Sequence, residues 1–158
     1  MPAQPSLTVN GWKLYAHPLF VEQYKMLFDK VEKLKEKDPK AYTKKNVTKR
    51  FAAIHKLAYD IIPQNPTLPE YRQGTTLRDN NKHWFRAKFF QQYRLFFRYH
   101  QASKIIVYVW VNDDKTKRAY ESKTDAYKVS SKMLASGNPP DSWGALLKSA
   151  SSLSSSLD

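Results

Sequence analysis

The sequence predicts an α+β fold, in which an N-terminal helical hairpin packs on one face of a small antiparallel β-sheet and a C-terminal helix follows. Two segments in the first part of the chain carry apolar residues at alternating spacings of four and three, which is the helical period. Two later segments alternate with period two and are rich in β-branched and aromatic residues, as strands are. The apolar stripes of the helices need a surface to cover, and one side of the sheet supplies it.

The first elements along the chain are a strand and two helices. Residues 7–15 are expected to form a short strand interrupted at Asn10. Pro18 is well placed to open the first helix, because its missing N–H would have no partner there, and Pro39 disfavours helical geometry just before it. A second helix is predicted over residues 40–62. The stripe residues are Phe20, Tyr24, Leu27, Val31 and Leu34, then Val47, Phe51, Ile54, Ala58 and Ile61.

A polar connection over residues 63–81 leads into the sheet. It is longer than a passive linker requires, which indicates either a functional loop or a simple surface excursion. The segment 82–100, KHWFRAKFFQQYRLFFRYH, has no acidic residue and alternates as two strands joined by Gln91 and Gln92. A third strand is predicted over residues 104–112.

The C-terminal part is predicted to be mainly helical. A helix is expected over residues 123–136, and residues around Trp143 could add a further amphipathic turn. We therefore expect one folded domain over residues 1–145. The Ser-rich segment 146–158 is expected to be disordered.

The alternation assigns the strand side chains to two faces of the sheet. One face is apolar and is expected to lie under the helical hairpin, while the other mixes cations with aromatic rings. The residues expected on the second, uncovered face are Arg86, Lys88, Arg94 and Arg98, with Tyr108 and Trp110 from the third strand. Like charges on neighbouring strands repel, by about a few tenths to 1 kcal/mol for each directly opposed pair. This face is therefore expected to bind an anion.

Composition narrows the class of partner. The chain has 158 residues, with 27 Lys and Arg against 14 Asp and Glu, and a net charge of +13. Such an excess indicates a polyanionic partner, most often nucleic acid, although an acidic protein would also fit. The absence of cysteine excludes disulfides and thiolate metal sites. Without an apolar run of membrane length or a secretion signal, the sequence predicts a cytoplasmic soluble protein with no membrane contact.

With other catalytic motifs absent, the sequence leaves Lys, Arg and Tyr side chains as the groups that could act on a phosphodiester. Neither metal-ligand spacing nor a Gly-rich nucleotide motif is present, so no metal or cofactor is expected. RNA supplies its own 2′-hydroxyl nucleophile, and a metal-free ribonuclease then needs positioned cations and one acid/base pair. Lys88 is the candidate base, because crowding by Arg86 and Arg94 lowers a lysine pKa. The competing hypothesis is a catalytically inactive nucleic-acid- or ribosome-binding module.

Three motifs carry a family resemblance: NGWKLYAHPLF near the start, YRLFFRY in the middle and KTDAYKVSSKML near the end. In this order they resemble the YhaV toxins of PrlF–YhaV toxin–antitoxin systems, among the RelE-like messenger-RNA interferases, over about residues 10–143. The resemblance implies a RelE-like fold and an endoribonuclease that cuts mRNA, within the ribosomal decoding site in the RelE pattern. It also implies a PrlF-like antitoxin, whose complex with the toxin would bind operator DNA and repress its own operon.

The resemblance further implies the catalytic residues. Arg86 and Lys88 on one strand, and Arg94 on the next, match the cations that surround the scissile phosphate in that family. The sequence departs from the family after the last strand, where NDD at 112–114 replaces basic residues. The missing basic residue is then Arg118 or Lys123, and the missing tyrosine is Tyr120 or Tyr127.

Of these alternatives we favour Arg118 and Tyr127, and Arg118 or His100 would protonate the leaving 5′-oxygen. The expected product is a 2′,3′-cyclic phosphate. The residues expected to bind substrate around this site are Arg98, His100, Tyr108, Trp110 and Lys123.

Overall fold

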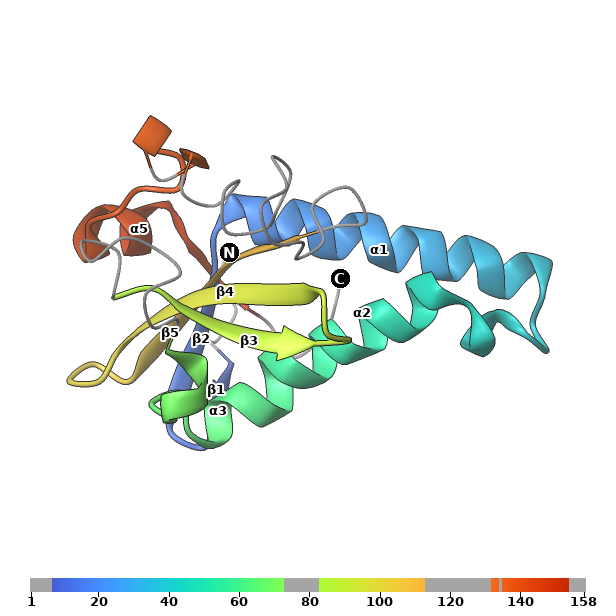
Figure 1. The fold of residues 1–158 in the computed structure, drawn as a ribbon, viewed down its shortest axis with the longest axis horizontal. Coiled ribbons are helices and arrows are strands. Elements are labelled where there is room, and N and C mark those ends of the chain that lie inside the picture. Colours follow the sequence, from blue (N-terminus) through green and yellow to red (C-terminus); the bar gives the residue numbers. More distant parts are fainter. Residues whose placement is uncertain (1–6, 73–82, 113–131, 134, 154–158) are drawn as a thin grey trace, which may run out of the picture.

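In the part of the chain that the structure describes, six strands form a mixed sheet at the centre of the fold (Figure 1). The structure is a computed structural model, and it describes residues 7–72, 83–112, 132–133 and 135–153. The strand order is β1-β2-β5-β4-β3, with β6 paired to β2. The strands are β1 (Thr8–Val9), β2 (Trp12–Ala16), β3 (Phe85–Phe89), β4 (Tyr93–His100), β5 (Ile105–Val111) and β6 (Ser151–Ser152).

The helical hairpin covers one face of this sheet and extends beyond it (Figure 1). Helix α1 (Pro18–Lys37) begins as predicted, and the His17 side chain caps it by accepting a hydrogen bond from the Leu19 N–H at 3.1 Å. The second helix starts later than predicted: a 3₁₀ turn, η1 (Tyr42–Lys44), precedes α2 (Asn46–Lys56). The His17 N–H donates to the Tyr108 carbonyl oxygen at 2.8 Å, and β2 pairs with β5 in parallel, so the start of α1 lies directly beside β5.

The end of the second helix differs from the prediction. A π-helical turn, η2 (Leu57–Ile61), follows α2 and leads into the short α3 (Ile62–Gln64). A π turn takes more residues than an α turn, so the apolar stripe moves by one position. Ile62 is fully buried, whereas Ile61, which was predicted to face the core, is 40% exposed.

Strands β3, β4 and β5 pair antiparallel as predicted, but the complete sheet is mixed because β2 joins β5 in parallel. A register shift between Phe96 and Phe97 also changes the faces of β5. Tyr108 now lies opposite Phe97 in the core under the helical hairpin, so its predicted position on the cationic face is wrong. A β-bulge inserts an extra residue into one strand, so the strict alternation of side chains between the two faces of the sheet fails across it.

The C-terminal segment covers the second face of the sheet, which was expected to be open. Helix α5 (Trp143–Ser149) buries Leu146 completely against Trp84, Phe96 and Val109. The predicted disordered tail is therefore wrong for residues 146–153, because α5 and the β6 pairing with β2 hold them on the sheet. Residues 154–158 and most of the helix predicted over 123–136 lie outside the described residues.

Within the described part of the chain, no helix combines the length and apolar character needed to cross a membrane.

Leu146→Ala tests whether α5 belongs to the folded domain. Removing a fully buried leucine leaves a cavity, so we expect the free energy of unfolding to fall by about 2–5 kcal/mol in urea titrations. Lys148→Ala, at an exposed position of the same helix, is the control and should change it by less than about 0.5 kcal/mol. Equal stability of the Leu146→Ala variant and the wild type would show that α5 is not part of the core.

Candidate nucleic-acid interface

The four strand cations lie on the sheet face opposite the helical hairpin, as predicted, but they differ in exposure. Arg86, Arg94 and Arg98 are only 8%, 6% and 9% exposed. Lys88 is exposed. The C-terminal segment covers this face around Phe96 and Arg98, whereas Lys88, on β3 at the margin of the sheet, stays exposed.

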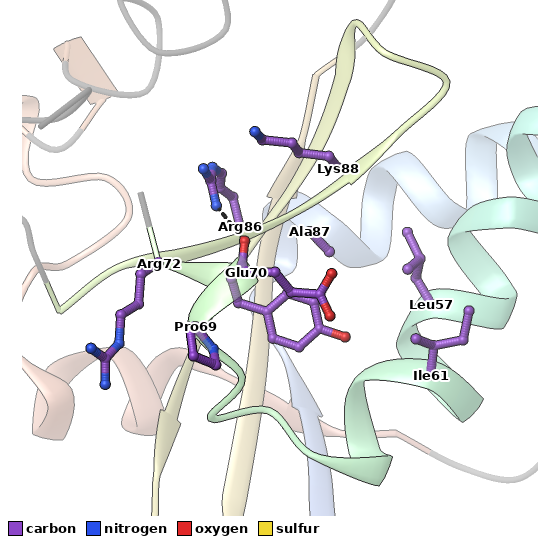
Figure 2. A pocket seen from close by; sticks show the side chains of 9 residues that line it. Leu57, Ile61, Pro69, Glu70, Arg72, Arg86, Ala87 and Lys88 are labelled. Carbon is purple, nitrogen blue, oxygen red and sulfur yellow. Dashed lines mark hydrogen bonds between the residues drawn. The ribbon is translucent and has the colours of Figure 1, made fainter. Parts of the chain in front are cut away.

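A pocket of about 610 Å³ lies at this margin, beside the edge strand β3 (Figure 2). Its lining combines a positively charged side with an apolar floor: Leu57, Ile61, Pro69, Glu70, Tyr71, Arg72, Arg86, Ala87 and Lys88. The side chains of Arg86 and Lys88 leave β3 on the side opposite Ala87, as alternation requires. Cations and one carboxylate thus surround a single open space.

One wall of the pocket comes from residues 69–72, within the connection predicted over residues 63–81. A 3₁₀ turn, η3 (Pro69–Tyr71), is tied to the sheet because Arg86 Nη1 donates a hydrogen bond to the Glu70 carbonyl oxygen at 2.8 Å. An isolated bridge pairs Arg72 with Phe85. Glu70 and Arg72 were missed in the sequence, where the length of this connection was the only signal that it could carry function.

Arg94 holds the turn between β3 and β4. Its Nη1 donates to the carbonyl oxygens of Gln91 at 2.5 Å and Tyr93 at 2.9 Å. Its backbone N–H donates to Asn112 Oδ1 at 2.6 Å, and Asn112 Nδ2 donates to the Gln92 carbonyl oxygen at 2.9 Å. Arg94, predicted as a phosphate ligand, therefore has a structural role in shaping the turn next to Lys88.

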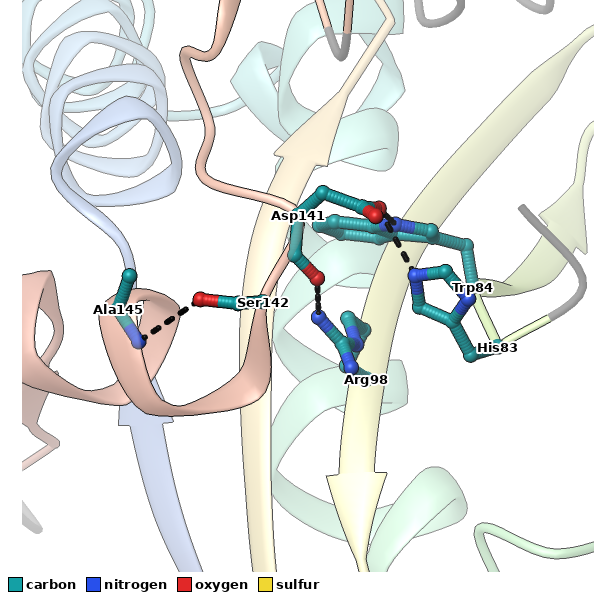
Figure 3. Close-up of polar contacts among 6 residues, drawn as sticks. All are labelled: His83, Trp84, Arg98, Asp141, Ser142 and Ala145. Atoms are coloured by element: carbon teal, nitrogen blue, oxygen red, sulfur yellow. Dashed lines mark hydrogen bonds and ion pairs between the residues drawn. The ribbon is translucent and has the colours of Figure 1, made fainter. Parts of the chain in front are cut away.

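Arg98 joins the C-terminal segment to the sheet (Figure 3). Its guanidinium lies over the rings of Trp84 and Trp143, at 5.2 and 5.7 Å from their centroids, and donates to the carbonyl oxygen of Asp141. Burial lowers the pKa of Arg98, and the nearby Asp141 charge offsets part of this effect. Arg98, predicted to bind substrate, is thus enclosed by aromatic rings.

The Asp141 carboxylate has two further hydrogen-bond partners, the side chains of Trp84 and His83. Oδ1 accepts from Trp84 Nε1 and pairs with His83 Nε2, both at 2.8 Å (Figure 3). Burial raises the pKa of Asp141, but the hydrogen bonds from Trp84 and His83 and the charges of His83 and Arg98 outweigh it, so the pKa is lowered overall.

The remaining predicted residues do not join the pocket. His100 stacks on Trp143, with ring centroids 5.4 Å apart. It lies six residues along β4 from Arg94, which pairs with Lys88. Six residues of a strand span roughly 20 Å, so His100 is far from Lys88. Trp110 stacks on Phe96 at 5.5 Å and is 9% exposed.

Tyr108 is fully buried on the hairpin side, where its hydroxyl donates to the Ala58 carbonyl oxygen and burial raises its pKa. It cannot contact RNA in this conformation. Arg118, Lys123 and Tyr127 lie outside the described residues. Among the residues that the structure does describe, no three His, Asp or Glu side chains gather as metal ligands would.

Comparison with known proteins identifies relatives over nearly the whole chain. Residues 14–151 match a family model, Toxin_YhaV, described as a toxin with endonuclease activity, of a toxin–antitoxin system. The chain is similar to the ribonuclease toxin YhaV of Escherichia coli strain K12, with 49% identity over 142 residues that cover 89% of this chain and 92% of that protein. It is 50% identical to toxin YhaV of E. coli O6:H1 over 140 residues, covering 87% and 91%. No solved structure gives a significant match.

Asp141→Asn tests whether the contacts of the Asp141 carboxylate stabilise the fold, through the pH dependence of the free energy of unfolding. Because the folded pKa of Asp141 is below its ordinary value of 3.8, its stabilising contribution is fully present above that value and is lost as the pH falls through the folded pKa. We expect the variant to be less stable than the wild type at pH 7, and the difference to shrink below about pH 4, in urea titrations across this range.

Asp29→Asn, at an exposed position of α1, is the matched control and should show a smaller difference at pH 7. A wild-type advantage over Asp141→Asn that stays constant from pH 7 to pH 3 would contradict the assignment.

Proposed function

The chain belongs to the YhaV family, the endonuclease toxins of toxin–antitoxin systems, and from this premise we propose that it cleaves messenger RNA without a metal ion at the pocket beside β3. Its activity class is endoribonuclease. Family membership therefore favours an enzyme over the inactive binding module that the sequence left open. The single observation that carries the location is the exposed Lys88 in an open pocket that also contains Arg72, Arg86 and Glu70.

The pocket supplies the charges that a phosphodiester needs. Arginine binds phosphate oxygens through its planar fork and stabilises the extra negative charge of a pentacoordinate transition state. Arg86 has one guanidinium nitrogen committed to the Glu70 carbonyl oxygen, which fixes its direction. Arg72, which also lines the pocket, supplies a second guanidinium. We assign these two residues to the scissile phosphate.

Proton transfer is assigned to the amine and the carboxylate that line the pocket. The 2′-oxygen attacks phosphorus, the bond from phosphorus to the 5′-oxygen breaks, and the products are a 2′,3′-cyclic phosphate and a 5′-hydroxyl. Because a carboxylate accepts a proton and an ammonium donates one, Glu70 takes the 2′-hydroxyl proton and Lys88 protonates the 5′-oxygen. This reverses the role expected for Lys88 and replaces His100, which is too distant, as the proton donor.

The partners follow from the family and the charge. The resemblance to RelE-like interferases supports mRNA on the ribosome as the substrate, and hence a cytoplasmic site of action. A toxin–antitoxin family implies a cognate antitoxin, which we propose to be PrlF-like and acidic where it meets the toxin. Its complex with the toxin would repress the operon through operator DNA.

The pH dependence of cleavage tests these assignments. In single-turnover assays with EDTA, Lys88→Ala should lower the rate constant by about 10²–10⁴-fold, as expected for loss of a general acid or base. Glu70→Gln should abolish the low-pH limb of the profile, and Lys88→Ala the high-pH limb. Lys13→Ala, at an exposed position of β2, is the control and should leave the rate unchanged within about twofold.

If Lys88→Ala instead lost the low-pH limb of the pH–rate profile, Lys88 would be the general base and not the acid. A strict requirement for a divalent cation, or a product with a 3′-hydroxyl, would exclude the mechanism.

A further inference from the structure

The turn between β3 and β4 displays an aromatic ring at the surface. Phe90 is 55% exposed, although it follows Phe89, which is 8% exposed. The Phe90 ring contacts the Phe89 ring edge-on at 5.6 Å, and Phe89 in turn stacks on Tyr93 at 5.3 Å. The exposed ring therefore rests on a buried aromatic pair, which limits its movement toward the core.

The backbone at this turn is strained. Phe90 has φ +46° and the next residue, Gln91, has φ +62°. Such left-handed conformations suit glycine and asparagine, and a bulky side chain disfavours them. Strain of this kind persists where surrounding structure enforces it, and it concentrates at functional sites. The chain thus keeps a large apolar ring at a position where a small polar residue would be more stable.

The surrounding structure does enforce this conformation. Arg94 Nη1 holds the Gln91 carbonyl oxygen, while Asn112 holds the Gln92 carbonyl oxygen and the Arg94 N–H. Three peptide groups in or next to the turn are thereby fixed from the sheet. Phe90 is presented by a preorganised support, so binding to its ring loses little conformational freedom.

The charges next to the turn indicate which kind of ligand would bind the Phe90 ring. Lys88 lies two residues before Phe90, lines the pocket and pairs across the sheet with Arg94. An apolar ring two residues along the chain from a cation, on a protein of net charge +13, matches a ligand that combines a flat aromatic surface with negative charge. An unpaired nucleotide is such a ligand, because its base stacks while its phosphate meets the cation.

We propose that Phe90 forms a nucleobase-stacking subsite, in which a base of the RNA next to the scissile phosphate packs on the ring. This inference rests on the proposed function, since the pocket beside Lys88 must hold the phosphate for the neighbouring base to reach the turn. Stacking does not read base edges, so the subsite contributes affinity and positioning for any base.

Two variants separate stacking from stability. Phe90→Asn removes the ring and relieves the backbone strain, so it should unfold at the same or higher urea concentration than the wild type. Gln91→Asn relieves strain at the neighbouring residue and keeps the ring. By fluorescence anisotropy with a mixed-sequence 2′-O-methyl RNA, which cannot be cleaved, we expect Phe90→Asn to weaken binding by about 5- to 100-fold. Gln91→Asn should bind like the wild type, and Phe90→Trp should bind as tightly or more tightly.

Each other outcome overturns the inference at a different level. Wild-type affinity and cleavage in Phe90→Asn would remove the subsite but leave the proposed function standing. Loss of antitoxin binding in Phe90→Asn, with RNA binding intact, would assign the ring to a protein contact instead. If the wild-type protein neither binds nor cleaves RNA, the proposed function and the subsite fall together.

Discussion

Burial of the central strands on both faces of the sheet determines where this protein can meet a ligand. Every residue of β4 from Tyr93 to Arg98 is buried. The helical hairpin covers one face of the strand, and the C-terminal segment packs on Phe96 and Arg98 of the other. The antiparallel strands therefore behave like those of a two-sided α/β sheet, which are covered on both faces. At the margin, β3 forms the edge of the sheet and Lys88 is exposed, which is why we propose the site there.

The buried arginines explain how such a sheet can carry so much charge. Burying a cation is unfavourable unless hydrogen bonds or aromatic rings replace its water. Each strand arginine meets this condition by holding a peripheral segment: Arg86 holds η3, Arg94 holds the β3–β4 turn, and Arg98 holds the segment at Asp141. Of these contacts, that of Arg86 with η3 holds a wall of the pocket, and those of Arg94 hold the turn next to Lys88. Each strand arginine thus has its own set of hydrogen-bond acceptors, which offsets the repulsion between the strand cations.

Sequence periodicity was sufficient for the features that depend on local pattern. It located α1, the antiparallel pairing of β3 with β4, and the shared face of Arg86 and Lys88. It failed where an extra residue changes the period, at the π turn before Ile62 and at the register shift that moves Tyr108 into the core. It also could not find contacts between distant segments, such as His83 with Asp141, because no pattern links residues 58 positions apart. The role of Glu70 depends on the same kind of distant contact.

The central claim is that RNA binds at the margin formed by β3, η3 and the β3–β4 turn. The most direct test is a titration of ¹⁵N-labelled protein with the uncleavable 2′-O-methyl RNA, followed by amide chemical shifts. We predict that the largest changes map to residues 70–72 and 86–92. The lysine-rich end of the helical hairpin, around Lys37, Lys40 and Lys45, offers a competing basic surface. Shifts concentrated there, with residues 86–92 unchanged, would contradict the account.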